Sequence, residues 1–163
     1  MVERERVRAS QSRVIEAVLR GAVYPDGFDA AGLDTAHDGV LRKRAWAVAG
    51  AWPLLARSLG GAYLDRFVGY VRAGRPFQPA DGSLLDGRWF ADHLRRHGGL
   101  PDLGTVQALS FDLHYRIEDD RVVRRSGPRV RLALLRHPPH LLVGVGWARV
   151  RIGKVPLGPR RIR

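Results

Sequence analysis

The sequence predicts an α+β fold, in which an N-terminal helical bundle of five or six helices is followed by a small antiparallel β-sheet. Apolar residues recur at helical spacing through the first three quarters of the 163-residue chain, and the pattern changes to alternation after the acidic run at residues 118–120. We therefore divide the chain into a helical domain, residues 1–116, and a basic antiparallel β annex packed on it, residues 117–163.

The strongest helical pattern lies in residues 43–76, where two apolar stripes are separated by Gly60-Gly61. The second stripe repeats at i, i+3, i+4 and i+7 and predicts a helix over residues 62–73. Pro53 is expected in the first turn of a short helix that precedes the glycine pair. The second stripe consists of Leu64, Phe67, Val68 and Val71.

Four further helices are predicted from apolar stripes, three of which end at glycine or proline. Asp29 is expected to cap a short helical turn within the polar connection that follows the first helix. Residues 75–87, which contain two prolines and two glycines, are expected to form an ordered loop. The four helices are predicted over residues 5–20, 38–51, 86–97 and 102–115.

Alternating apolar residues in two segments, 129–135 and 141–147, predict an antiparallel sheet, and residues 149–155 resemble a third strand. We expect Val130, Leu132 and Leu134 to face the helices, and the arginines between them to face solvent. The residues predicted to bind a partner are Arg124, Arg129, Arg131, Arg149, Arg151 and Lys154.

The net charge of +12 lies entirely in the β annex. Residues 121–163 contain eleven arginines and Lys154 but no aspartate or glutamate, whereas the preceding residues carry equal numbers of basic and acidic side chains. The chain's preference for arginine over lysine is typical of a GC-rich genome, so an Arg-filled solvent face is one explanation. A face that is merely solvated usually mixes both signs, however, and this favours a surface that contacts an anionic partner.

No pattern in the sequence predicts a catalytic site, a cofactor or a metal. Ser110 and His114 flank Asp112, but side chains two residues apart on a helix do not face each other, so these three cannot form a relay. His93 and His97 have the i, i+4 spacing of a metal pair, yet two arginines lie between them. We interpret this pair as a helix end and leave its metal binding open. The protein is expected not to be an enzyme.

Composition also restricts the class of protein. The absence of cysteine excludes disulfides and thiolate chemistry and suits a reducing compartment. The N-terminal residues are charged and unlike a signal peptide, and the longest uncharged runs, 12 residues each, are shorter than a membrane-spanning helix. We expect a cytoplasmic protein with no membrane contact.

Short motifs within residues 10–116 carry one family resemblance. They are Lys43-Arg44, Trp52-Pro53-Leu54-Leu55, Leu59-Gly60, Tyr63-Leu64, Phe67-Val68, Arg75-Pro76, Phe90-Ala91 and Leu100-Pro101-Asp102-Leu103. The chain in this respect resembles the domain, described as DNA-binding, at the N-terminus of the HvfC/BufC group. Proteins of that group are similar to partner proteins of multinuclear non-haem iron oxidases that modify ribosomally made peptides.

This resemblance implies a helical domain and a non-catalytic role in presenting a precursor peptide to an iron oxidase. It implies no catalytic residue, because the matched positions are packing and turn residues. The leading hypothesis is an accessory protein whose basic sheet docks an acidic peptide or enzyme, by strand addition at an exposed sheet edge. The alternative is a nucleic-acid binding module that uses the same arginines.

Overall fold

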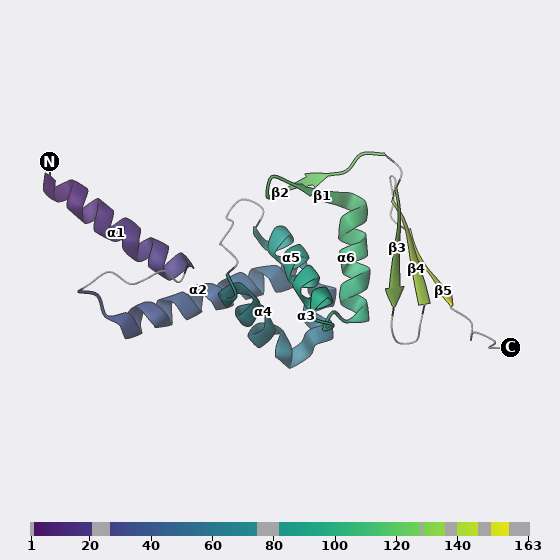
Figure 1. The fold of residues 1–163 in the computed structure, drawn as a ribbon, viewed down its shortest axis with the longest axis horizontal. Helices are drawn as coiled ribbons and strands as arrows, with labels where there is room; N and C mark the ends of the chain where they lie inside the picture. Colours follow the sequence, from purple (N-terminus) through teal and green to yellow (C-terminus); the bar gives the residue numbers. More distant parts are fainter. Residues whose placement is uncertain are drawn as a thin grey trace.

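The structure, a computed structural model, describes residues 2–20, 27–74, 82–127, 129–135, 140–146 and 151–156. Within these ranges the predicted fold class is confirmed, because helices precede small antiparallel sheets (Figure 1). The helices are α1 (Val2–Arg20), α2 (Ala30–Ala51), α3 (Pro53–Leu59), the 3-10 turn η1 (Gly60–Ala62), α4 (Tyr63–Arg72), α5 (Gly82–Arg96) and α6 (Asp102–His114). The strands are β1 (Tyr115–Glu118), β2 (Arg121–Arg124), β3 (Arg129–Leu135), β4 (His140–Gly146) and β5 (Arg151–Pro156).

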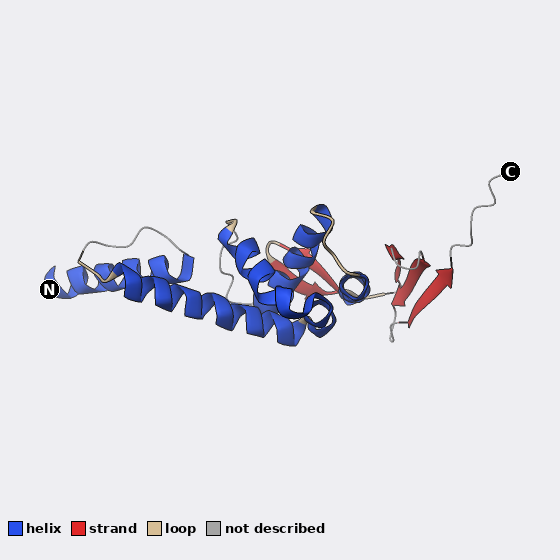
Figure 2. Cartoon of the chain, turned by 90° about the horizontal axis from the view of Figure 1, so that it is seen from below, coloured by secondary structure: helices blue, strands red, loops and turns tan. Residues whose placement is uncertain are grey.

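The molecule is elongated, and its two ends differ in structure (Figure 2). At one end, α1 packs along the first half of α2, and together they project from the body. Helices α2 to α6 form the body. At the other end, the three-stranded sheet lies beyond α6.

Helix α2 begins at Ala30, eight residues before the predicted start at residue 38. Asp29 caps it as predicted, because its carboxylate accepts hydrogen bonds from the backbone N–H groups of Ala31 and Gly32, both at 3.1 Å. The cap therefore starts a long helix and not a short turn. The first half of α2 packs on α1 and is mostly exposed, so its sequence lacks the apolar stripe that identifies a core helix.

Helix α5 also begins earlier than predicted, at Gly82 and not at residue 86. The predicted loop therefore ends before Gly82, and its residues 75–81 lie outside the described ranges. Gly82 and Ser83 have loop-like composition, but the first turn of the helix also contains residues that pack on the core. Leu85 and Asp86 are both buried in the body, and their burial stabilises the helix from its start.

The core of the body is built from aromatic side chains of α2 to α6. Phe67 of α4 and Phe90 of α5 meet edge to face, with ring centroids 5.3 Å apart. Trp52, between α2 and α3, is fully buried, and its indole N–H donates to the carbonyl of Leu84 at 3.1 Å. Pro53 occupies the first turn of α3, as predicted.

Two antiparallel sheets follow the helices, where the sequence analysis predicted one. Strands β1 and β2 form a hairpin through Asp119 and Asp120, whose φ angles of 48° and 59° suit a tight two-residue turn. The second sheet has the order β3-β4-β5. It contacts α6 through β3 and β4.

The orientation of the second sheet corrects the prediction. Val130, Leu132 and Leu134 are exposed, and the opposite face, which carries Ala133 and Leu135, packs on α6. The reason is Gly144 of β4, where an added Cβ would lie 2.6 Å from Leu113 Cδ1. The small residues Ala133 and Gly144 let the helix approach this face beside Leu135, and Val130, Leu132 and Leu134 are left outside.

Candidate functional site

A groove of about 430 Å³ lies between α6 and β3. Figure 1 shows these two elements side by side and running in opposite directions. The helical wall is a single stripe of α6, with Asp102, Thr105, Leu109 and Asp112 spaced at i, i+3, i+7 and i+10. Arg95 and Leu100 complete this wall.

The strand wall consists of four consecutive residues of β3, from Arg131 to Leu134. Successive side chains of a strand point to opposite faces of a sheet, so four consecutive residues border one groove only where the strand's edge lines it. Strand β3 is an edge strand, since among the described strands it pairs with β4 alone. Half of its peptide groups therefore point away from the sheet, toward the groove.

Three arginines gather near the start of β3. The side chain of Arg125 donates from Nε to the carbonyl of Tyr115 at 2.7 Å. Burial, followed by the positive charges of Arg129 and Arg131, lowers the pKa of Arg125; the negative charge of Asp112 opposes this, and Arg116 adds a smaller lowering effect. Within the described ranges, no carboxylate forms an ion pair with Arg125, Arg129 or Arg131. We call these three residues the arginine cluster.

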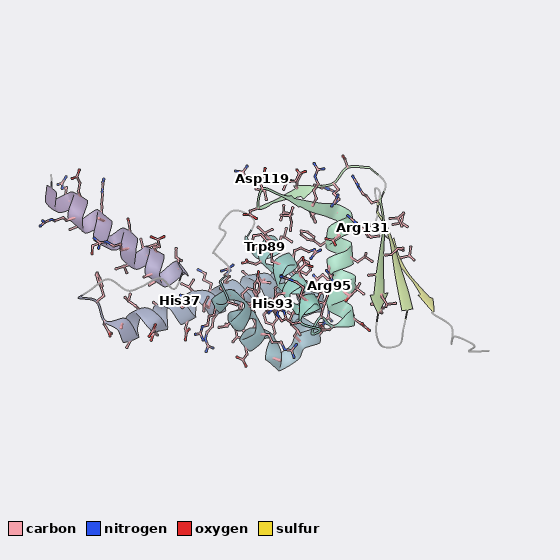
Figure 3. All side chains as sticks on the ribbon, in the orientation of Figure 1. His37, Trp89, His93, Arg95, Asp119 and Arg131 are labelled. Atoms are coloured by element: carbon pink, nitrogen blue, oxygen red, sulfur yellow. The ribbon has the colours of Figure 1, made fainter. Side chains whose placement is uncertain are left out.

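Asp112, the acidic residue of the groove that acts on Arg125, already forms an ion pair with Arg88. Asp112 accepts from Arg88 Nε at 2.8 Å and from a second guanidinium nitrogen of Arg88 at 3.0 Å. Burial alone would lower the pKa of Arg88, but its hydrogen bonds to Asp112 and Asp92 outweigh that effect, and the pKa is raised. The end of the groove next to the arginine cluster therefore keeps an excess of positive charge. Arg131, at this end, is labelled in Figure 3.

The structure brings together only some of the predicted partner-binding residues. Arg129 is half-buried, Arg131 is exposed, and both lie on β3 beside α6, whereas Arg124 is exposed on the separate hairpin strand β2. Arg149 lies outside the described residues. Arg151 and Lys154 lie on β5, where Arg151 pairs with Val145 and so occupies a register position on the face opposite Arg131.

The other candidate constellations do not assemble into a site. The rings of His93 and His97 are 4.3 Å apart, but His97 Nδ1 lies 2.7 Å from the carbonyl of His93. Asp112 binds Arg88, and His114 Nδ1 lies 2.9 Å from the carbonyl of Ser110, so the two do not form a relay. Among the described residues, no group of three or more histidine or acidic side chains could hold a metal ion.

Sequence reasoning identified Arg131 from charge but missed the helical wall of the groove. Thr105 and Asp112 have the spacing of one helix stripe, which was the available signal, but that stripe contains both polar and apolar residues and resembles an ordinary solvent face. No described helix is long and apolar enough to cross a membrane.

Comparison with known proteins gives one finding. A family model described as "SCO6045-like, C-terminal domain" matches residues 8–96, which span α1 to α5. No curated protein and no solved structure matches the chain. The groove and the arginine cluster lie C-terminal to the matched region, apart from Arg95.

Proposed function

The chain belongs to the SCO6045-like, C-terminal domain family, and we propose that it is a non-catalytic accessory protein that binds an acidic, extended peptide in the groove between α6 and β3. The single observation that carries this proposal is the edge of β3 along the groove, with four consecutive residues lining it. An extended peptide can pair with such an edge as an additional strand.

The dimensions of the groove support a short peptide segment. Four residues of an extended strand span about 13 Å, and Arg131 to Leu134 supply that length of edge. Peptide side chains would alternate between the α6 side, near Thr105 and Arg131, and the outer side, near Leu132 and Leu134. This favours a peptide in which acidic and apolar residues alternate.

The arginine cluster supports the acidic character of the ligand. The positive charges of these guanidinium groups repel one another. A carboxylate that docks beside them would reduce this repulsion and also form a charge-assisted hydrogen bond. The resemblance of residues 10–116 to the HvfC/BufC group suggests a precursor peptide as the ligand and an iron oxidase as the protein to which it is presented. Both remain part of the proposal.

The experiment measures the fluorescence anisotropy of a labelled peptide of about eight residues, in which glutamate and valine alternate. Two further peptides carry N-methyl groups on the odd or on the even backbone nitrogens. Strand addition uses alternate N–H groups, so one methylated peptide should bind like the parent and the other should not bind. Equal binding of both, or of neither, would contradict strand addition.

Variants of the protein test the location. Thr105→Trp fills the groove from the helical wall and should abolish peptide binding, whereas Ala47→Trp, at an exposed position of α2, should not. Arg131→Glu should weaken binding by at least about tenfold. Arg121→Glu, which changes the charge of an exposed position on β2 by the same amount, is the matched control.

Nucleic-acid binding is a second candidate function, favoured by the arginine cluster, which lacks carboxylate partners among the described residues. Phosphate contacts would make binding depend steeply on salt. For each phosphate neutralised on duplex DNA, the logarithm of the affinity would fall by about 0.9 for every tenfold rise in salt concentration. Thr105→Trp separates the two functions, because it blocks the groove and leaves the arginines in place. No binding to duplex or single-stranded oligonucleotides at low salt would exclude this candidate.

A further inference from the structure

The three-stranded sheet has an exposed apolar face, which we call the outer face. It consists of Val130, Leu132, Leu134 and Val145, with exposed fractions of 64%, 62%, 60% and 45%. Val130 pairs with Val145 and Leu132 with Val143, so these residues form adjoining rows across β3 and β4. The outer face is opposite the face that packs on α6. The sheet itself lies at the end of the molecule beyond α6 (Figure 2).

The distribution of residue sizes makes this face unusual. A sheet that packs on one helical layer ordinarily places its large aliphatic residues inside and polar residues outside. In this sheet, Ala133, Leu135 and Gly144 face α6, while Val130, Leu132, Leu134 and Val145 face outward. A row of exposed large aliphatic side chains on a monomer marks an interaction surface.

Charge identifies the kind of partner. The segment that spans this sheet, residues 129–156, contains six basic residues and no acidic one. A second copy of the chain, docked face to face, would bring the same positive charge against it. We propose that the outer face docks a folded protein whose own apolar patch is bordered by aspartate and glutamate.

This interface adjoins the proposed peptide site and shares Leu132 and Leu134 with it. Val130 and Val145 belong to the outer face but do not line the groove. With a peptide held at the edge of β3 and a second protein on the outer face, the two ligands would lie on adjoining surfaces of one small sheet. The chain would then act as an adaptor that holds a peptide beside another protein.

The test places a photo-crosslinking amino acid at residue 145, in the full chain in its native cells, with residue 7 as the control site. Val7 is also an exposed valine, 49% accessible, but it lies on α1 at the other end of the molecule. The protein that crosslinks from residue 145 and not from residue 7 is identified, purified and titrated against the wild-type chain. It is then titrated against the double variant Val130→Thr/Val145→Thr and the control Val7→Thr.

We expect an acidic protein that binds the wild type and the Val7 variant equally and the double variant about tenfold more weakly. The crosslinked region of that protein should combine apolar and acidic side chains. A crosslinked dimer of the chain itself, a basic partner, no crosslink beyond background, or equal affinity for the double variant would each overturn the proposal. Peptide binding by Val130→Thr/Val145→Thr is measured alongside, so that a failure of the groove and a failure of the outer face are told apart.

Discussion

Arg44 of α2 and Asp86 of α5 form an ion pair inside the helical body. The Nε atom and a terminal nitrogen of Arg44 each lie 2.6 Å from a different carboxylate oxygen of Asp86, and the two side chains are only 5% and 3% exposed. The two residues are 42 positions apart in sequence, and their pairing fixes the position of α5 on α2. Each of the two buried charges therefore needs the other as its partner.

Asp86→Ala is expected to destabilise the fold by about 3–5 kcal/mol, because it leaves the guanidinium of Arg44 buried without its counter-charge. The free energy of unfolding, measured by urea denaturation, checks this. The matched control is Asp38→Ala, which removes the acid of an exposed pair with Arg72, whose two side chains are 51% and 58% exposed. That change should cost about 0–1 kcal/mol, and equal effects of the two substitutions would contradict the prediction.

Gly87→Ala is expected to destabilise the body because α5 passes directly over Trp52. An added Cβ would lie 2.1 Å from the Cδ1 atom of the indole, and the buried ring has no room to move away. We expect a loss of at least about 1–3 kcal/mol in urea denaturation. Gly69→Ala in α4 meets no atom within 4 Å and should instead stabilise the protein by about 0.5–1 kcal/mol.

The sequence predicted those elements whose local pattern and tertiary surroundings agree. Helix α4 was expected over residues 62–73 and is found at Tyr63–Arg72, because its apolar stripe faces the core along its whole length. The first half of α2 was missed because, among the described elements, it packs mainly on α1 and stays mostly exposed. The ion pair of Arg44 and Asp86 has no local signal at all, since its partners meet only when α2 and α5 pack.

The candidate site could be predicted in charge but not in shape. The surplus of arginine after residue 120 indicated an anionic ligand from composition alone. The groove depends on α6 and β3 lying side by side, and no periodicity within either segment encodes that arrangement. The outer face was misassigned because alternation defines two faces without saying which is covered, and Gly144 decides this through its contact with Leu113.

Stability is expected to fall at alkaline pH through Tyr63. Burial, and then the negative charge of Asp86, raise the pKa of this phenol above its ordinary value of 10.0, while its hydroxyl donates to the carbonyl of Ala45 at 2.7 Å. The folded state thus retains a proton that the unfolded state loses. This contribution is complete below about pH 10 and decreases by up to about 1.4 kcal/mol per pH unit above it.

Urea denaturation between about pH 8 and pH 11 measures this decrease, with Tyr63→Phe as the comparison. The phenylalanine variant loses one hydrogen bond, at a cost of about 1 kcal/mol at neutral pH. Its stability should then depend less steeply on pH above 10 than that of the wild type. Parallel curves for the two proteins would show that Tyr63 does not contribute to the alkaline loss.

Gly144→Ala is expected to loosen the three-stranded sheet from α6, since the new methyl group would lie 2.6 Å from Leu113 Cδ1 and 3.1 Å from Leu109 Cδ2. Both neighbours are ends of leucine side chains, so the cost should be moderate, about 1–3 kcal/mol. Hydrogen exchange should accelerate in β3 and β4 and remain unchanged in α4 and α5, which pack mainly on other helices. Leu113→Ala makes room for the methyl group, so the double variant should be less destabilised than the sum of the two single variants. Additive effects would mean that Gly144 and Leu113 do not meet in solution, and the groove beside them would lose its helical wall.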